Sequence, residues 1–301
     1  MESAPSDMYV LLLMLAPLGG ALIILLGKVF PLTYSLFPSF LVWFGGTAYS
    51  LFCTVPSGTS PVSLLYAFGG WMEPYGIVLE LNWVSWAAVL LGFLIGLTLW
   101  LHTYGSRSYG DRSYGDRAYG SYFYLTFYLA FFALHGVLLS RDLFNLFIWF
   151  ELLSLCSFIL VAYDRSPGAI FAALRYLFLS TVSIMIFLLG VWILYYHSGS
   201  PSFSRIGEFL EGVSPASPLR SQATMAVSLI TAGIITRSAI LPFHTWLPSA
   251  HASAPYPVSA LLSGFVIKAP LLALWHFYAI LPFNPMNSIL TWLGLLSALF
   301  G

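Results

Sequence analysis

The chain has 301 residues, of which 59% are hydrophobic and 7% are charged, and its formal net charge is zero. A soluble domain carries roughly 25% charged residues, so this composition excludes an ordinary soluble globule and is typical of a protein embedded in lipid. The zero net charge gives no indication of nucleic-acid binding or of a polybasic patch at a membrane surface.

Hydrophobic runs of about 20 residues, the length of a helix that crosses a bilayer, predict the transmembrane segments. The first run follows an acidic start and lacks a charged leader region and a cleavage site, so we expect a retained helix rather than a signal peptide. The predicted fold is an all-α membrane protein of about nine transmembrane helices, at residues 8–29, 33–54, 78–101, 121–140, 143–163, 168–196, 222–241, 256–281 and 288–301.

Short connections rich in Gly, Pro and Ser separate these runs, as at residues 56–61 and 198–217, and no soluble module is expected among them. One connection, Tyr104–Gly120, has the sequence YGSRSYGDRSYGDRAYG, in which a Tyr-Gly repeat carries alternating Arg and Asp. Its composition favours a solvated flexible linker, and an interaction loop is the alternative. Cys53 and Cys156 both lie in apolar runs, so neither a disulfide framework nor a metal site is expected.

The distribution of lysine and arginine favours an N-terminus outside the membrane. In that orientation the inner connections carry more of these residues than the outer ones. The inner residues are Lys28, Arg107, Arg112, Arg117 and Arg165, and the outer ones are Arg141, Arg205 and Arg220.

Apart from Lys28 and Glu80 at the ends of their spans, four charged residues lie within the predicted spans: Glu151, Arg175, Arg237 and Lys268. A charge at the centre of a membrane helix costs roughly 2.5–3.5 kcal/mol on insertion scales, so we expect these side chains to face the bundle interior, paired or hydrated. Glu151 and Lys268 lie near the middle of their spans, where burial can pull their pKa values towards neutrality, as a proton relay requires. A fixed salt bridge that orients helices is the alternative, and the position at mid-membrane favours a functional role.

The other ionisable residues within the spans are less favourable proton carriers. Arg175 lies about two turns into its span, where a relay role and snorkelling to the interface fit equally well. Arg237 lies near the inner end of its span, and because an arginine keeps its proton, it can set the pKa of a neighbour but is a poor carrier itself. His135 and His276 are weaker candidates.

A proline-rich segment, ILPFHTWLPSAHASAPYPVSA, follows the seventh span. Pro242 removes a backbone donor there and disturbs the carbonyl of Ser238. Broken helices at membrane depth are tolerated where they line a cavity, which is where transporters place ion sites. His244 and His251 in this segment are candidate proton shuttles near neutral pH, and interfacial loop histidines are an equal alternative.

Three segments resemble one family of membrane proteins, and together the resemblance covers essentially the whole chain. PFHTWLPSAHASAPYPVSALLSGFVIKA closely resembles the signature of the antiporter-like proton-translocating subunits. LFNLFIWFELLSLCSFILVAY resembles their fifth helix, and GGWMEPYGIVLELNW resembles the stretch that leads into their third. This family includes the large membrane-arm subunits of respiratory complex I, the A and D subunits of Mrp-type antiporters, and their counterparts in membrane-bound hydrogenases.

The resemblance implies roles for individual residues. Glu151 matches the fifth-helix glutamate that tunes its partner, and Lys268 matches the eighth-helix lysine on a central hydrophilic axis. His244 and His251 are implied candidates for the proton path. Ser263, where the long complex I type has a histidine, favours the shorter, D-like type.

The chain departs from the family pattern at residue 237, where a lysine is normal and this sequence has arginine. Because an arginine does not deprotonate, we expect Glu151 and Arg237 to form a permanent ion pair, which leaves Lys268 and water to carry the proton. A modified pump and a subunit specialised for transmitting conformational or electrostatic signals both fit this departure.

The chain also departs in length. Family members normally contain a three-helix N-terminal group and two inverted five-helix repeats. Here residues 1–120 match the N-terminal group with its connecting loop, residues 121–281 match the first repeat, and residues 282–301 match the start of a ninth helix. The second repeat is absent, so either another chain supplies it or the sequence is partial, and a partner in the membrane is expected.

The leading hypothesis is a proton- or sodium/proton-translocating subunit of a redox-driven or Mrp-type complex. The alternative is a non-pumping structural or coupling subunit of such a membrane arm. We expect no cofactor and no redox centre of its own, because the sequence has neither a cysteine cluster nor a phosphate loop. The expected partners are other membrane subunits and the lipid bilayer, and the expected location is a prokaryotic cell membrane, with the mitochondrial inner membrane and the thylakoid as alternatives.

Overall fold

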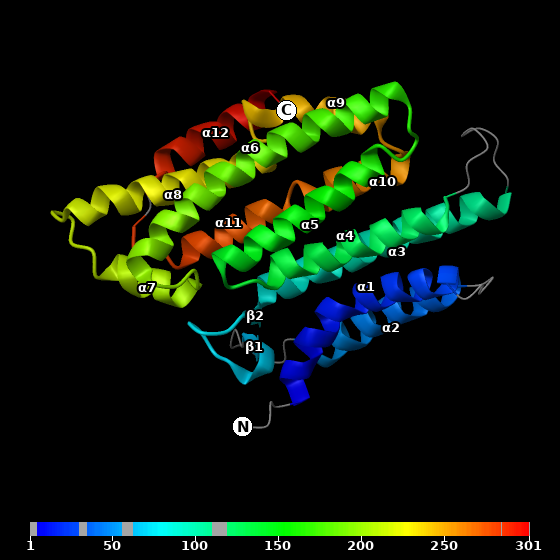
Figure 1. Cartoon of the computed structure of the whole chain (residues 1–301), viewed down its shortest axis with the longest axis horizontal. Helices are drawn as coiled ribbons and strands as arrows, with labels where there is room; N and C mark the ends of the chain where they lie inside the picture. The colour runs from blue at the N-terminus through cyan, green and yellow to red at the C-terminus, as the bar shows by residue number, and fades with distance from the viewer. Residues whose placement is uncertain (1–4, 30–34, 56–62, 110–118, 284, 301) are drawn as a thin grey trace.

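The computed structural model describes the chain except for residues 1–4, 30–34, 56–62, 110–118, 284 and 301. Long helices lie side by side, and a short antiparallel hairpin covers one end of them (Figure 1). The elements are α1 (Pro5–Val29), α2 (Leu36–Cys53), β1 (Leu64–Ala67), η1 (Phe68–Gly70), β2 (Val78–Leu81), α3 (Trp83–Tyr109), α4 (Ser121–Leu139), α5 (Leu143–Val161), α6 (Pro167–Ser198), α7 (Phe203–Glu211), α8 (Pro218–Arg237), η3 (Phe243–Trp246), α9 (Leu247–Ser253), α10 (Tyr256–Leu261), η4 (Leu262–Val266), α11 (Ala269–Ala279) and α12 (Asn287–Phe300).

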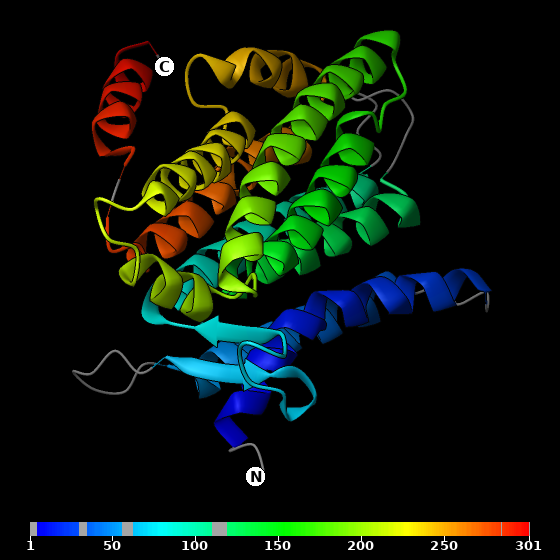
Figure 2. The same ribbon diagram turned by 60° about the vertical axis from the view of Figure 1, so that its left-hand side comes forward.

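The N-terminal helices α1 and α2 form an antiparallel pair that packs on α4 (Figure 2). Their backbones approach closely at Gly20, where an added Cβ would lie 2.9 Å from the carbonyl oxygen of Ser39. Trp43 of α2 is fully buried and packs its ring against Phe127 and Phe131 of α4. Aromatic packing therefore joins the N-terminal helices to the rest of the bundle.

The third predicted span was wrong at its start. Residues 78–81 do not begin a helix but form β2, which pairs antiparallel with β1 in a register that joins Leu64 to Leu81 and Ala67 to Val78. The helix α3 begins after the strand, because the Asn82 side-chain oxygen accepts a 2.9 Å hydrogen bond from the Ser85 amide and so caps the first turn. Three of the four residues of β2 are apolar, so the strand merges with the helix behind it in a hydrophobicity scan.

The helices α4, α5, α6, α8 and the pair α10–α11 lie alongside one another and form the larger part of the bundle (Figure 2). Local capping sets where several of them begin. Asp142 accepts a 2.7 Å hydrogen bond from the Asn145 amide at the start of α5, and Ser166 accepts one of 3.2 Å from the Ala169 amide at the start of α6. The helix α6 ends at Gly199, whose φ of 73° lies in the left-handed region that glycine tolerates.

The break predicted after the seventh span is present. The helix α8 ends at Arg237, and Ala239 has a positive φ of 53°. The chain then continues through η3 and α9 instead of a continuous helix. Trp246 anchors this segment, because its buried ring stacks on Tyr176 of α6 with the ring centroids 4.1 Å apart.

The connection at residues 198–217, predicted as a loop, contains the short helix α7. Its buried residues Phe203, Ile206 and Leu210 recur at helical spacing and face the bundle. On its outer side Arg205 and Glu208 form an exposed ion pair of 2.7 Å. An amphipathic surface helix of nine residues has apolar residues on one face and polar residues on the other. A search for long apolar runs therefore does not detect it.

Seven helices within the described residues are long and apolar enough to cross a membrane. The helix α8 has the length but a more polar sequence, and α12 spans 14 residues, so the predicted spans at 222–241 and 288–301 lack a helix that meets both conditions. Large apolar side chains such as Phe171, Phe178 and Trp192 of α6 are exposed on the outside of the bundle, as lipid contact requires. Most of the Tyr-Gly repeat lies outside the described residues.

Candidate functional site

Arg237 is a buried charge between the helices α5, α6 and α8. Its residue surface is 6% exposed, and its guanidinium reaches from the end of α8 to α5 and α6. One terminal nitrogen, Nη1, donates to the Phe150 carbonyl at 3.2 Å, to Ser154 Oγ at 2.5 Å and to Ser180 Oγ at 3.1 Å. The other, Nη2, donates to Glu151 Oε1 at 3.0 Å.

The ion pair between Glu151 and Arg237 is therefore formed, as the sequence led us to expect. It is unequal in burial, because the Glu151 side chain is 45% exposed and that of Arg237 is 5% exposed. A guanidinium keeps its proton and presents a planar set of donors, which suits a site with several fixed acceptors. The pair accordingly presents a fixed positive charge inside and a carboxylate that reaches the surface of the bundle.

Close packing of α6 and α8 brings Ser180 to Arg237. An added Cβ at Gly233 would lie 2.8 Å from the Ser183 carbonyl oxygen, and one at Gly190 would lie 2.6 Å from the Ala226 carbonyl oxygen. Ser183 Oγ also donates to the Gly233 carbonyl at 2.7 Å. Small residues at a membrane helix interface let the backbones approach in this way, and here they set the distance between Arg237 and α6.

Lys268 lies at a second irregularity, the π-turn η4 between α10 and α11. The Ile267 amide donates to the Leu262 carbonyl, one residue earlier than in an α-helix, and the Lys268 amide donates to the Phe265 carbonyl at 2.9 Å. Neither bond uses the Ser263 carbonyl, and Lys268 Nζ donates to it. The missing amide hydrogen of Pro270, two residues later, favours the same interruption. The helix break thus provides the acceptor for the ammonium group.

Lys268 is not enclosed by the bundle, contrary to the expectation for a mid-membrane charge. Both Lys268 and Ser263 are exposed, and the exposed Trp275 and Ala279 continue the same side of the helix. Arg237, in contrast, faces the bundle interior and is paired, as expected for such a charge. Phe150, Ser154 and Ser180 enclose it within the helices described above.

Arg175 does not face the bundle interior either. It is exposed on α6 among the exposed apolar side chains of Phe171, Leu174 and Phe178. Within the described part of the chain it forms no ion pair. This position fits snorkelling along the outside of the helix better than a place in an internal relay.

The two histidines of the broken segment differ in their surroundings. His244 is exposed in η3, whereas His251 in α9 is partly buried and its Nδ1 lies 2.7 Å from Ser259 Oγ on α10. Partial burial lowers the pKa of His251, so its neutral form is favoured near pH 7. His251 is therefore held in the form that can accept a proton.

The structure joins some of the predicted site residues and separates others. Glu151 and Arg237 form one pair, and among the described residues no hydrogen bond or ion pair connects that pair to Lys268, His244 or His251. The described residues also contain no cluster of His, Cys, Asp and Glu that could hold a metal ion.

Sequence reasoning missed the partners that surround Arg237. Ser154 lies three residues after Glu151, which places it on the same face of α5, so helical spacing alone could have identified it. Ser180 of α6 and the Phe150 carbonyl carried no such signal, because their role depends on how closely α6 and α8 pack.

Residues 140–301 match the sequence profile of the family described as NADH:quinone oxidoreductase/Mrp antiporter, TM. A similar relative is the NADH-quinone oxidoreductase subunit N of Desulforudis audaxviator, which is 29% identical over 78% of this chain and 46% of its own length. Another is the putative antiporter subunit mnhD2 of Staphylococcus haemolyticus, 30% identical over 71% of this chain and 40% of its own length. The chain thus spans less than half the length of these relatives.

The fold resembles a chain of an archaeal respiratory membrane complex, the membrane-bound sulfane sulfur reductase. The TM-score is 0.79 at 22% sequence identity, and the match covers 93% of this chain and 55% of the other. The resemblance read from the three sequence segments is confirmed at the level of the family and of the fold.

Proposed function

Because this chain belongs to the NADH:quinone oxidoreductase/Mrp antiporter transmembrane family, we propose that it translocates protons, or exchanges sodium for protons, as one subunit of a multi-subunit membrane complex. The observation that carries the proposal is the position of Lys268 at the π-turn between α10 and α11, with its ammonium group on the Ser263 carbonyl. A π-turn inside a membrane helix disrupts regular backbone bonding, and such interruptions frequently lie at functional sites.

Lys268 is the residue to which we assign proton uptake and release. A single carbonyl acceptor holds the ammonium form without neutralising it, so the proton can leave when a better acceptor approaches. His251 lies on α9, just before the helix of Lys268 begins, and is hydrogen-bonded to Ser259 of α10. It is favoured in its neutral form and is the proposed donor and acceptor on that side. The exposed His244 is the proposed contact with water.

The Glu151–Arg237 pair is proposed to act as a fixed charge rather than as a carrier. Four hydrogen bonds to the guanidinium hold Arg237 in place, and its proton does not leave. The half-exposed Glu151 carboxylate is the member of the pair that we propose responds to charge changes in its surroundings. In this proposal Arg175 lies at the lipid interface and takes no part in the relay.

We further propose that the exposed side of α10 and α11 is the contact with another membrane subunit, one that supplies a second helix repeat. Lys268 and Ser263 are exposed on this side, and a charged residue facing lipid is costly. A partner that covers them would enclose the proton path between two helix groups. The N-terminus is proposed to lie outside a prokaryotic cell membrane.

The second candidate function is a structural or coupling subunit that does not pump. The observation that favours it is the set of four hydrogen bonds that the two terminal nitrogens of Arg237 donate, at the position where the family resemblance implies a lysine. Lys268 opposes it, because a purely structural subunit does not need a titratable ammonium group at a helix break.

Proton transport by the reconstituted complex distinguishes the two functions. We expect Lys268→Ala to abolish coupled proton uptake into proteoliposomes while the complex still assembles. Lys28→Ala is the matched control, because Lys28 is the other lysine of the chain and lies over the Tyr122 ring at a helix end. Equal uptake in both variants would leave only the structural role.

A further inference from the structure

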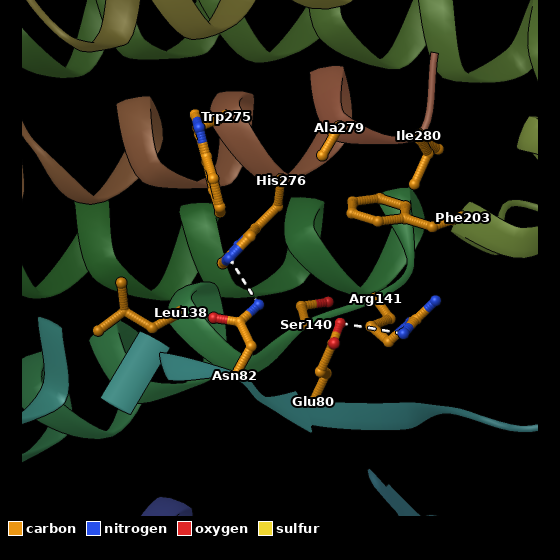
Figure 3. Close-up of a pocket in the computed structure, with 10 residues that line it drawn as sticks. All are labelled: Glu80, Asn82, Leu138, Ser140, Arg141, Phe203, Trp275, His276, Ala279 and Ile280. Carbon is orange, nitrogen blue, oxygen red and sulfur yellow. Dashed lines mark hydrogen bonds and ion pairs between the residues drawn. The ribbon is translucent and has the colours of Figure 1, made fainter. Parts of the chain in front are cut away.

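A cavity of about 230 Å³ lies at the end of the bundle that carries the hairpin (Figure 3). Its polar lining comes from β2 and the residue after it, from the link between α4 and α5, and from α11, and it consists of Glu80, Asn82, Ser140, Arg141 and His276. This end is opposite to the broken segment with His244 and His251 (Figure 1). The path proposed above therefore does not use it.

Asn82 fixes the protonation state of His276. The side-chain oxygen of Asn82 already accepts the Ser85 amide at 2.9 Å, so its NH2 group is the one that faces His276 Nε2, 3.1 Å away. An NH2 group donates, and Nε2 must then accept. His276 is accordingly neutral with its proton on Nδ1, and the nitrogen with a lone pair is turned towards the cavity residue Asn82 (Figure 3).

The charges around the cavity favour cations. Arg141 lies between two carboxylates, with Nε 3.1 Å from Glu73 Oε1 and Nη1 3.0 Å from Glu80 Oε2. Asp142 adds less negative charge than an exposed aspartate would, because burial raises the pKa of its carboxyl group and disfavours the carboxylate. On α7, Arg205 and Glu208 offset each other in an exposed pair. Of the charged groups, Glu80 and Arg141 line the cavity itself, and Glu73 lies behind Arg141. The two carboxylates outnumber the one guanidinium, so this group carries a net negative charge that attracts cations.

We propose that His276 is a second proton-exchanging residue of this subunit, reached from the hairpin end through the cavity. Its Nε2 takes a proton from a protonated water, which leaves as neutral water, and the imidazolium N–H then displaces the Asn82 amide. Release of the same proton restores the bond to Asn82. The inference rests on the proposed function and extends it, because Lys268 lies eight residues earlier on the same broken helix, about 12 Å along its axis.

The test measures coupled proton transport by the reconstituted complex carrying His276→Gln. Glutamine keeps an oxygen that can accept the Asn82 amide, so the local structure is retained while proton exchange is lost. We expect at least a fivefold loss of uptake with unchanged assembly. His197→Gln is the matched control, because His197 lies at the same end of the bundle, stacked on Phe209 and outside the cavity, and we expect it to stay within twofold of the wild type.

Asn82→Asp separates proton exchange from a structural role. Aspartate still caps α3, but its carboxylate stabilises the imidazolium of His276, so the pH at which uptake is half-maximal should move upwards by about one unit or more. Loss of uptake in Lys268→Ala together with wild-type uptake in His276→Gln would overturn this inference and leave the proposed function intact. Wild-type uptake in both variants would overturn both.

Discussion

Arg237 is surrounded by acceptors that a lysine could not satisfy. Its two terminal nitrogens donate to Phe150, Ser154, Ser180 and Glu151 on two different helices, which a single ammonium group with three donors cannot reproduce. Through this network Arg237 links α8 to α5 and α6. Its cost of desolvation is offset only while all the partners are present.

Removal of the guanidinium should therefore destabilise the protein strongly. Arg237→Ala leaves buried acceptors without a donor, and we expect a loss of about 3 kcal/mol in the free energy of unfolding, measured by denaturant titration in detergent. Arg175→Ala is the matched control on α6, and because Arg175 is exposed and unpaired among the described residues, its effect should stay within about 0.5 kcal/mol. Similar losses in the two variants would contradict the account of this network.

The same residue allows a test of transport. Arg237→Lys places a group that can release its proton beside Glu151, so coupled transport should rise in proteoliposomes, at some cost in stability. If Arg237→Lys and Arg237→Ala both transported like the wild type, the fixed-charge role of the pair would be wrong.

His135 is a buried histidine whose hydrogen-bond partner is a backbone carbonyl. Pro17 has no amide hydrogen, so in α1 it cannot bond the carbonyl of Leu13 four residues earlier. His135 Nδ1 lies 2.8 Å from that carbonyl oxygen and donates to it from α4. The histidine thus replaces the hydrogen bond that the proline removes, and joins α1 to α4.

This pairing predicts a coupled effect of two substitutions. His135→Phe should lower the free energy of unfolding by about 1–3 kcal/mol, because it leaves the buried Leu13 carbonyl without a donor. In a Pro17→Ala background residue 17 supplies an amide to the same carbonyl, so the cost of His135→Phe should fall by about 1 kcal/mol or more. A double-mutant cycle by denaturant titration measures the coupling, and equal costs in both backgrounds would refute the link.

At the scale of elements, the contact between α6 and α8 positions the charged site. Gly190 and Gly233 leave no space for a side chain, and a Cβ at either position would press on backbone of the facing helix. We expect Gly233→Val to separate the helices, break the hydrogen bonds of Arg237 to Ser180, and reduce the yield of folded protein severalfold by size-exclusion chromatography.

Gly45 of α2 is the control for this substitution. An added Cβ there meets no atom within 4 Å, and alanine favours a helix over glycine, so Gly45→Ala should leave the yield unchanged or slightly improved. Wild-type yield for Gly233→Val would show that the close approach of α6 and α8 is not required.

The sequence was informative wherever one local pattern decided the structure. Seven long apolar runs correspond to helices of spanning length, and the prolines after Arg237 correctly predicted a break. The hairpin was missed because ten residues separate β1 from β2, and strands of four residues are too short to show a distinct period. The π-turn at Lys268 was missed, although Pro270, which lacks an amide hydrogen, was a sequence signal for an irregular helix there.

Burial of the charged residues was the least predictable property. Glu151, Arg175, Arg237 and Lys268 have the same apolar surroundings in the sequence, yet Arg237 alone among them is buried in the described structure. Burial depends on which face of each helix meets a neighbour, and the sequence of a helix that is apolar all round gives little indication of that face. Which of these charged residues is buried could therefore be determined only once the packing of the helices was known.

At the scale of the whole molecule, the chain places its candidate proton groups at three levels. His244 and His251 lie in the broken segment, Lys268 lies within the long helix that follows it, and His276 lies at the hairpin end. Lys268 lies on the exposed side of α10 and α11. We propose that a second helix repeat covers this side. A path along this contact would connect the two ends of the bundle, with the Glu151–Arg237 pair as its fixed charge.

Coupled proton uptake by proteoliposomes that contain the complex with Lys268→Arg tests this account most directly. Arginine keeps the positive charge at the π-turn but does not release its proton. If Lys268 carries protons, Lys268→Arg should lose uptake as fully as Lys268→Ala does. Uptake at the wild-type level in Lys268→Arg would show that the charge alone is sufficient, and would contradict a proton-carrying role for this lysine.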